Sequence, residues 1–385
     1  MPSVVRVQVE PTVLKWARER SGIPEERLAV RFPKLAAWEA GEEQPTLKQL
    51  ESFASATHTP AGFLFLQAPP QEPVPIPDFR TIASAGVERP SPDLLDTVYI
   101  CQQRQEWYRT YAQSIQEEPV AFIGSASVED DMAEVASAMR DTLGFGLEAR
   151  QQYSSWTAAL SGLSERAEIT GVLVMVSGVV GSNTHRVLDP QEFRGFALAD
   201  PIAPLVFLNG ADTKAAQIFT LAHELAHLWI GTTALSNATA ETPGNNAIER
   251  WCNQVAAELL VPLPAIRDQY RTSAALTEEL DRLAARFRVS TLVILRRVHD
   301  AGYLTSAQYR AAFEAELERI VAVFPSGSGG NFYNTLPVRA SKRFTRALIA
   351  STLGGRTLYQ DAFRLLGFKK VSTLNELAKS LGVVA

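Results

Sequence analysis

Two histidines and the glutamate between them are the part of this sequence best suited to chemistry. His223 and His227 are two of only five histidines in the chain, and Glu224 directly follows the first of them. Each residue of a helix turns about 100°, so the two imidazoles lie on one face, one turn apart. Two neutral imidazoles suit a zinc ion, and an adjacent carboxylate can reach a bound water without being a ligand. The segment therefore predicts a zinc site with Glu224 as its general base.

A catalytic zinc site needs a third protein ligand, and the helix expected over residues 247–260 offers two glutamates. Glu249 and Glu258 are nine positions apart, which places them on opposite faces of a helix, so only one can face the metal. Glu249 is favoured, because Asn253 lies one turn further on the same face and can support a histidine. Glu258 stands among apolar residues, and we expect it to make a structural contact instead. The 22 residues from His227 to Glu249 leave room for a loop and a returning helix.

These groups together predict peptide hydrolysis. Zinc would lower the pKa of a bound water, and Glu224 would accept the proton and later pass it to the leaving amine. Substrate backbone needs an exposed strand to pair with, and PLVFLNG, residues 204–210, is a candidate for that edge strand. No residue is assigned to stabilise the oxyanion: His185 is a candidate, and an ordinary surface-loop histidine is the alternative.

The segments around the motif predict a core of both strands and helices. Apolar, β-rich runs at residues 171–180, 192–199 and 204–210 are expected strands. Apolar residues recur at helical spacing before and after them, and a polar loop is expected at 232–246. Helices are expected over residues 91–112, 128–143, 154–169, 247–260 and, in several pieces, 277–323. The fold class is therefore α+β, mostly helical, with a small mixed sheet in a zinc-peptidase core.

Proline-rich and glycine-rich stretches divide the chain into modules. Residues 68–77, APPQEPVPIP, are too rich in proline for a helix or a central strand and predict a stiff linker. Residues 1–67 before it are helical in pattern, and residues 78–323 hold the core with the metal site. FPSGSGGN, residues 324–331, predicts a flexible linker to a helical C-terminal module at 332–385.

Composition restricts the class of protein. The 385 residues are 46% hydrophobic and 21% charged with a net charge of -5, which is typical of a globular protein without a basic field for nucleic acid. No secretory signal and no run of about 18 apolar residues is present, so we expect no membrane association. Cys101 and Cys252 are too few for a disulfide framework and suit a reducing compartment. We therefore expect a cytoplasmic protein in which both cysteines are small buried apolar residues.

The residues of the motif resemble the ImmA/IrrE family of zinc metallopeptidases. The similarity is carried by FTLAHELAH after a strand that ends in LNG and by the later segment IERWCNQVAAELLVP, and it extends from about residue 170 to 302. It implies an endopeptidase core in which His223, His227 and Glu249 match the metal ligands and Glu224 matches the catalytic glutamate. Members of this family typically act on regulatory proteins, often repressors of the phage type, so the resemblance also implies a repressor as substrate.

Residues 1–67 resemble the Cro/C1 (Xre) helix-turn-helix, a module that ImmA/IrrE proteins often carry. The resemblance rests on LAVRF and on WEAGEEQPTLKQLESFA. Between Ala29 and Glu39 it lacks about four residues of the usual turn and recognition helix, so the module is degenerate. Arg6 to Glu51 holds eight basic and eight acidic residues, which leaves no net charge to bind phosphate. DNA binding is one interpretation of this module, and protein docking or a vestigial role is the other.

Two later segments also carry basic side chains. Residues 277–313 resemble the helix-turn-helix-like subdomain that follows the catalytic helices in this family, and one of their expected helices bears Arg296 and Arg297. This subdomain either contacts DNA or packs against the active site. The C-terminal module begins with the basic segment SKRFTRALIASTL, which is either a solvated helix face or a surface for a partner protein or nucleic acid.

The leading hypothesis is an intracellular zinc-dependent endopeptidase that cleaves a regulatory protein such as a helix-turn-helix repressor. The rival hypothesis is a DNA-binding or partner-binding regulator, similar to an antitoxin, whose zinc site is structural or idle. Glu224 favours the enzyme, because a structural metal site has no need of a general base.

Overall fold

The computed structural model describes residues 5–78, 90–236, 247–323 and 337–383. The chain divides into an N-terminal unit, residues 1–75 with 86–98, and a main unit, residues 76–85 with 99–385. The change from one unit to the other falls at Pro75 and Ile76, inside the proline-rich stretch. The linker expected at residues 324–331 lies outside the described residues.

The N-terminal unit consists mainly of short helices around one apolar core. They are α1 (Pro11–Arg20), α2 (Glu25–Arg31), α3 (Leu35–Glu39), α4 (Leu47–Ala56) and the 3₁₀-helix η1 (Ala61–Phe65). Thr46 and Gln49 start α4 with a reciprocal pair of hydrogen bonds, in which each side chain accepts from the backbone N–H of the other. Leu14, Trp38 and Phe53 are buried in the centre of the unit. Helix α3 has only five residues, at the point where the sequence lacks part of the helix-turn-helix pattern.

The main unit is organised around a four-stranded mixed sheet in the order β1-β3-β2-β4. The strands are β1 (Leu173–Ser177), β2 (Gly195–Leu198), β3 (Leu205–Asn209) and β4 (Ala234–Ser236). β1 and β3 are parallel, whereas β2 pairs antiparallel with both β3 and β4. Among the described strands, β1 and β4 therefore form the two edges.

The prediction that residues 204–210 form an edge strand is wrong, because β3 is central. Its residues are at most 2% exposed, and β1 and β2 pair with it on either side. The physical reason is visible in the sequence LVFLN. In a strand buried on both faces, apolar residues follow one another without the alternating polar residues of a half-exposed strand. The expected loop at 232–246 is also corrected in part, because Ala234–Ser236 form β4. The rest of that loop, residues 237–246, lies outside the described part of the chain.

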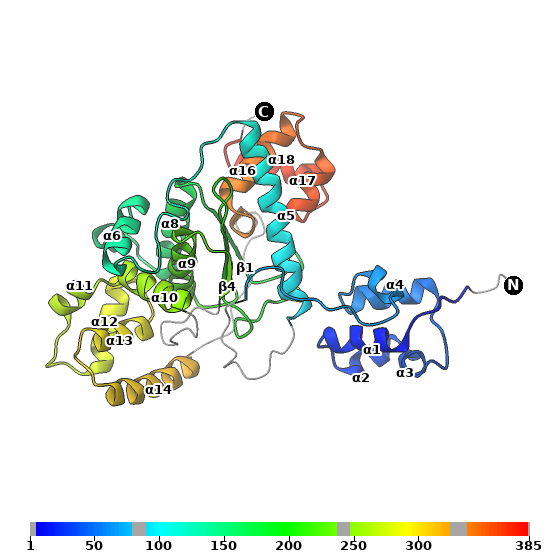
Figure 1. The fold of residues 1–385 in the computed structure, drawn as a ribbon, viewed down its shortest axis with the longest axis horizontal. Coiled ribbons are helices and arrows are strands. Elements are labelled where there is room, and N and C mark those ends of the chain that lie inside the picture. The colour runs from blue at the N-terminus through cyan, green and yellow to red at the C-terminus, as the bar shows by residue number, and fades with distance from the viewer. Residues whose placement is uncertain (1–4, 79–89, 237–246, 324–336, 384–385) are drawn as a thin grey trace. The chain divides into compact units, whose positions relative to one another are not determined.

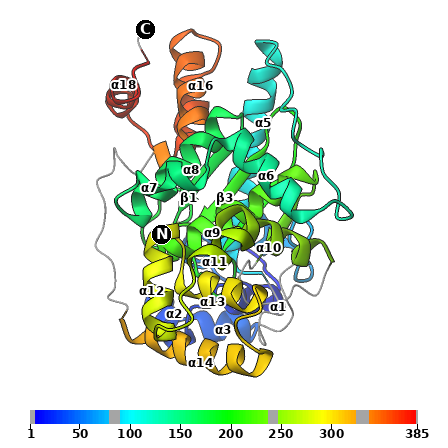
Figure 2. The ribbon, with the colours of Figure 1, turned by 90° about the vertical axis from the view of Figure 1, so that its left-hand side faces the viewer.

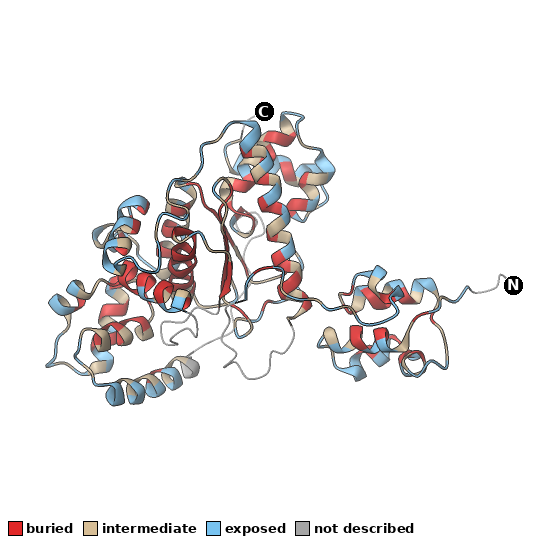
Figure 3. Cartoon of the chain, in the orientation of Figure 1, coloured by how far each residue is buried: buried red, intermediate tan, exposed pale blue. Residues whose placement is uncertain are grey.

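Helices cover both faces of the sheet (Figure 1). They are α8 (Trp156–Ile169) and α9 (Lys214–Trp229) on one face and α5 (Pro92–Ser114) on the other. Figure 2 shows α8 and α9 in front of the strands with α5 behind. Every residue of α9 from Gln217 to Trp229 is buried, so this helix forms part of the continuous buried centre in Figure 3. On the other face, the Gln105 side chain of α5 donates to the carbonyl oxygens of Leu198 and Ala203.

The other helices of the main unit flank this centre. Before β1 in the chain lie α6 (Met132–Leu143) and α7 (Leu147–Gln151), after β4 lie α10 (Ala247–Leu260), α11 (Leu263–Gln269), α12 (Leu276–Phe287), α13 (Thr291–Asp300) and α14 (Ser306–Val323), and the C-terminal helices are α16 (Lys342–Leu353), α17 (Tyr359–Leu366) and α18 (Val371–Ser380). Helix α10 packs against both α6 and α9, and α16 contacts β1. The fold is thus α+β and mostly helical with a small mixed sheet, as the sequence predicts.

A membrane-spanning helix is not found: within the four described ranges, no helix is both long enough and apolar enough to cross a bilayer.

Candidate metal centre

Helix α9 directs two imidazoles toward one point. The helix starts directly after the turn that follows β3, where the Thr213 hydroxyl accepts from the Ala216 N–H at 3.2 Å. His223 and His227 lie one turn apart, and their Nε2 atoms are separated by 3.0 Å. Both side chains are completely buried. The local helix thus produces the arrangement of nitrogen atoms that the spacing of the histidines predicts.

Glu249 joins the two histidines from the first turn of α10. Its carboxylate oxygens lie 3.4 Å from Nε2 of His223 and 3.0 Å from Nε2 of His227. Burial raises the pKa of this carboxyl, but the two histidines outweigh burial and bring the pKa down to about 2. The ligand atoms of the three residues lie within 4.8 Å of one another, and we call these residues the ligand cluster. The structure therefore brings together the three side chains that the sequence nominates as metal ligands.

The geometry of the ligand cluster fits a divalent metal ion. Two imidazole nitrogens and one carboxylate oxygen are a donor set of catalytic zinc sites, where tetrahedral ligand atoms are about 3.3 Å apart. The separations of 3.0 and 3.4 Å around His223 are of that size. Burial lowers the pKa of His227, which favours the neutral ring that a metal ligand requires. Glu224 and Glu249 are both buried at this site, where a divalent cation would offset the cost of burying their negative charge.

Glu224 lies beside the ligand cluster without belonging to it. Its side chain is completely buried, and neither carboxylate oxygen has a hydrogen-bond partner among the described residues. Burial and the negative charge of Glu249 raise the pKa of Glu224 well above its ordinary value. A raised pKa lets this carboxyl hold a proton more readily than an ordinary glutamate does, which suits a general acid–base group.

Ser236 of β4 reaches the ligand cluster, although the sequence did not identify it. Its Oγ lies 3.4 Å from Nε2 of His227 and 3.5 Å from a carboxylate oxygen of Glu249. A single serine in a polar loop carries no signal of such a role. Ser236 reaches the site only because β4 pairs with β2, where its register partner is Gly195.

Gly195 is the second residue that the sequence did not identify. A Cβ at this position would lie 2.6 Å from Cγ2 of Thr220 and 3.1 Å from Oε1 of Glu224. Both contacts are on α9, so the missing side chain lets the helix of the histidines approach β2 closely. The need for glycine at position 195 also arises from tertiary packing, so no local sequence motif indicates it.

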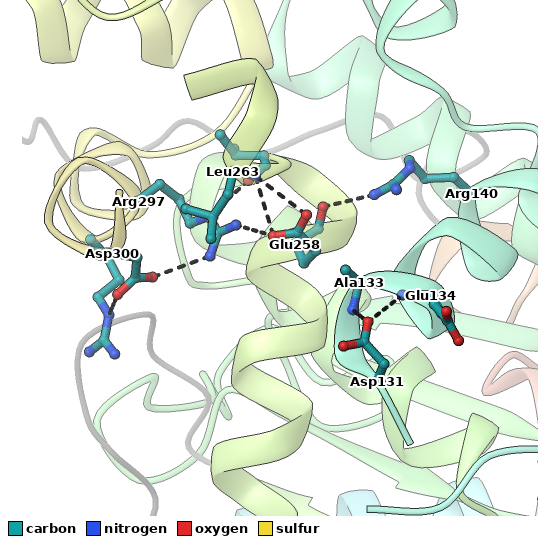
Figure 4. Close-up of polar contacts among 10 residues, drawn as sticks. Asp131, Ala133, Glu134, Arg140, Glu258, Leu263, Arg297 and Asp300 are labelled. Carbon is teal, nitrogen blue, oxygen red and sulfur yellow. Dashed lines mark hydrogen bonds and ion pairs between the residues drawn. The ribbon is translucent and has the colours of Figure 1, made fainter. Parts of the chain in front are cut away.

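Glu258 makes a structural contact on the other side of α10 (Figure 4). Its carboxylate forms an ion pair with Arg297 of α13 and accepts from the Leu263 N–H at the start of α11. Arg297 also donates to the carbonyl oxygen of Val261 at 2.8 Å. Of the two glutamates weighed as third ligand, Glu249 is thus the one beside the histidines, and Glu258 connects three helices.

The remaining candidate residues lie outside the ligand cluster. His185 is exposed in the segment between β1 and β2, and its backbone N–H donates to the Asn183 side chain. No hydrogen bond joins Asn253 to His223, whose Nδ1 has no partner among the described residues. Cys101 and Cys252 are free and buried, and burial raises the pKa of the first to about 12 and that of the second well above its ordinary value.

Comparison with known protein families finds a metallopeptidase-family match in this core. Residues 167–299 match the family model described as the IrrE N-terminal-like domain (Peptidase_M78). The match extends from the end of α8 through most of α13, and it supports the ImmA/IrrE resemblance for this part of the chain. Residues 340–380 match the model of a domain of unknown function (DUF8813). No curated protein and no solved structure matches the chain.

Proposed function

We propose that this chain is a zinc-dependent endopeptidase. The observation that carries the proposal is Glu224, a buried carboxyl with a raised pKa that lies beside the ligand cluster and is not one of its members. Burying a carboxyl without a hydrogen-bond partner costs free energy, and a metal site that only stabilised the fold would not need one there. The match of residues 167–299 to a metallopeptidase family supports the same class of reaction.

The proposed chemistry assigns a separate task to each side chain. His223, His227 and Glu249 would hold the metal ion, which would supply Lewis-acid chemistry toward water and a peptide carbonyl. Glu224 accepts the proton of the attacking water and donates it to the leaving amine, which returns the carboxyl to its starting state. The Ser236 hydroxyl lies beside Nε2 of His227 and the Glu249 carboxylate, so it borders the position that a bound metal and its water would occupy.

The substrate of this reaction would be an extended peptide that pairs with β4. An edge strand has unpaired backbone groups, and an extended chain adds to it as a further strand. Among the described strands β4 is the edge next to the ligand cluster, because Ser236 is its last residue. The resemblance to the ImmA/IrrE family supports a regulatory protein, such as a helix-turn-helix repressor, as the source of that peptide.

The N-terminal unit supports the docking of a protein better than the reading of DNA. Helix α3 stands where a recognition helix would be expected, but Leu35 and Trp38 are buried and Glu39 is paired with Arg18. Its remaining residues are alanines, which offer no hydrogen bonds to base edges. A gel-shift assay on DNA from around the protein's own gene tests this interpretation, and a sequence-specific shift would contradict it.

The central experiment compares the wild type with Glu224→Gln. Both proteins are incubated with candidate repressors from the same genome, and their zinc content is measured by mass spectrometry. We expect equal zinc content and a loss of cleavage of about 10²- to 10⁴-fold in the variant, because the amide cannot accept a proton. Equal cleavage by both proteins, or cleavage by neither, would contradict the peptidase proposal. The rival hypothesis, a regulator with an idle metal site, would then be favoured.

A further inference from the structure

The proposed active site is closed. His223, Glu224 and His227 are 0% exposed, and Glu249 is 4% exposed. β4 is an edge strand of the described sheet, yet each of its three residues is 0% exposed as well. An extended substrate therefore cannot pair with β4 unless whatever covers that edge moves away.

Residues Ile76–Asp78, at the end of the proline-rich linker, lie along this edge. The Leu235 N–H donates to the carbonyl oxygen of Pro77 at 2.9 Å, and Asp78 forms a parallel bridge with Leu235. Ile76 is buried at 7% exposure, whereas Pro77 and Asp78 are exposed. The segment thus takes up a backbone donor of β4 that an added substrate strand would use.

This contact lies close to the chemistry. Leu235 directly precedes Ser236, whose hydroxyl contacts both His227 and Glu249. A chain bound at Leu235 therefore occupies the part of the edge that is one residue away from a side chain in contact with the metal ligands. The contact belongs to the main unit, because residues 76–85 and β4 are both part of it.

We propose that Ile76–Asp78 is an internal strap that competes with the substrate for β4 and holds the protein in an autoinhibited state. The proposal rests on the peptidase function proposed above. Because the strap is covalently attached, its effective concentration at β4 is high, so it excludes a weakly binding substrate. Among the described residues the strap forms one isolated bridge with β4, between Asp78 and Leu235, so its ladder is short and the strap stays releasable.

The first test loosens the strap by removing its buried side chain. Ile76→Ser deletes most of the apolar surface that anchors the segment, and Pro77→Gly, at an exposed position, makes the released segment more flexible and so favours release. Val74→Ser is the matched control, since Val74 lies in the same linker outside the bridge. All proteins are full-length, loaded with Zn²⁺, and checked for folding by circular dichroism.

Two measurements report on the strap independently of any cleavage. Hydrogen exchange of the Leu235 amide should be slow in the wild type and in Val74→Ser and roughly tenfold faster in Ile76→Ser and Pro77→Gly, because its acceptor has left. The chelator 4-(2-pyridylazo)resorcinol should extract Zn²⁺ faster from the same two variants. The synthetic peptide EPVPIPD, which copies residues 72–78, should slow both processes again in Ile76→Ser.

The outcomes separate the strap from the peptidase function. If Leu235 exchanges at the unprotected rate in the wild type, or equally in all four proteins, the strap proposal is overturned. Faster repressor cleavage by Ile76→Ser and Pro77→Gly than by the wild type supports both proposals. If both variants show faster exchange and extraction but cleave no repressor, the strap stands as a cover of the metal site and the peptidase proposal fails.

Discussion

At the scale of single residues, the distance between α9 and β2 depends on one missing side chain. We predict that Gly195→Ala lowers stability by about 1–3 kcal/mol, the usual cost of inserting a methyl group into a packed core. The new Cβ would lie 2.9 Å from the carbonyl oxygen of Phe207, a backbone atom that cannot rotate away. Cleavage should fall as well, since Glu224 is displaced. Chemical denaturation and an assay of repressor cleavage measure the two effects.

Gly62→Ala is the control for this substitution. A Cβ at Gly62 would meet no atom within 4 Å, so we expect little change in stability or activity. Equal stability of Gly195→Ala and the wild type would show that the helix and the strand are not in close contact at this position.

The two glutamates of α10 should respond to substitution in opposite ways. Glu249→Ala removes a member of the ligand cluster, so we predict a loss of bound zinc. Glu258→Ala should leave the zinc content unchanged but lower stability by about 1–3 kcal/mol, because Arg297 loses one of its two ion-pair partners and keeps only Asp300. Metal analysis and urea denaturation of both variants test this, and a loss of zinc in Glu258→Ala would reverse the assignment.

At the scale of elements, Glu168 joins α8 to the start of α16. Its carboxylate accepts from the Ser341 hydroxyl at 2.5 Å and from the Arg343 N–H at 3.4 Å. Burial raises the pKa of Glu168, and these hydrogen bonds offset burial only in part. A carboxyl whose pKa is higher in the folded state stabilises the fold most when it is protonated. Its contribution is complete below the ordinary pKa of 4.5 and is lost as the pH rises through the folded value.

We therefore predict that Glu168→Gln becomes more stable relative to the wild type as the pH is raised from 4 to 8. The amide oxygen can still accept both hydrogen bonds, but it carries no charge to bury. Urea denaturation across this pH range measures the difference. Glu165→Gln, an exposed position on the same helix, is the control and should show no such trend. A constant difference between Glu168→Gln and the wild type would contradict the assignment.

At the scale of the whole molecule, the N-terminal unit has a core of its own. Phe53 is 0% exposed within that core, so we predict that Phe53→Ala costs about 3–5 kcal/mol, enough to unfold a small unit. The main unit, loaded with Zn²⁺, should retain the metal and its thermal transition. Calorimetry and metal analysis test this, with the half-exposed Phe65→Ala as the control. Loss of zinc in Phe53→Ala would show that the two units do not fold independently.

The sequence by itself determined the parts of the site that depend on local spacing. His223, Glu224 and His227 belong to one helix, where the rotation per residue places both imidazoles on one face. The same periodicity identified α10 and showed that Glu249 and Glu258 cannot face the same way. The α+β class followed from apolar runs and helical repeats, which are local patterns too.

Only the tertiary structure decided which strand is an edge, which residues meet across strands and what covers the site. β3 is central because β1 and β2 pair with it on either side. Ser236 and Gly195 lie at the site because they are register partners in the pairing of β4 with β2. The bridge from Asp78 to Leu235 joins segments that are far apart in the chain. Backbone groups pair in the same way whatever their side chains are, so such contacts have no local sequence signal. The ligand cluster could therefore be predicted from the sequence, whereas access to it depends on the fold.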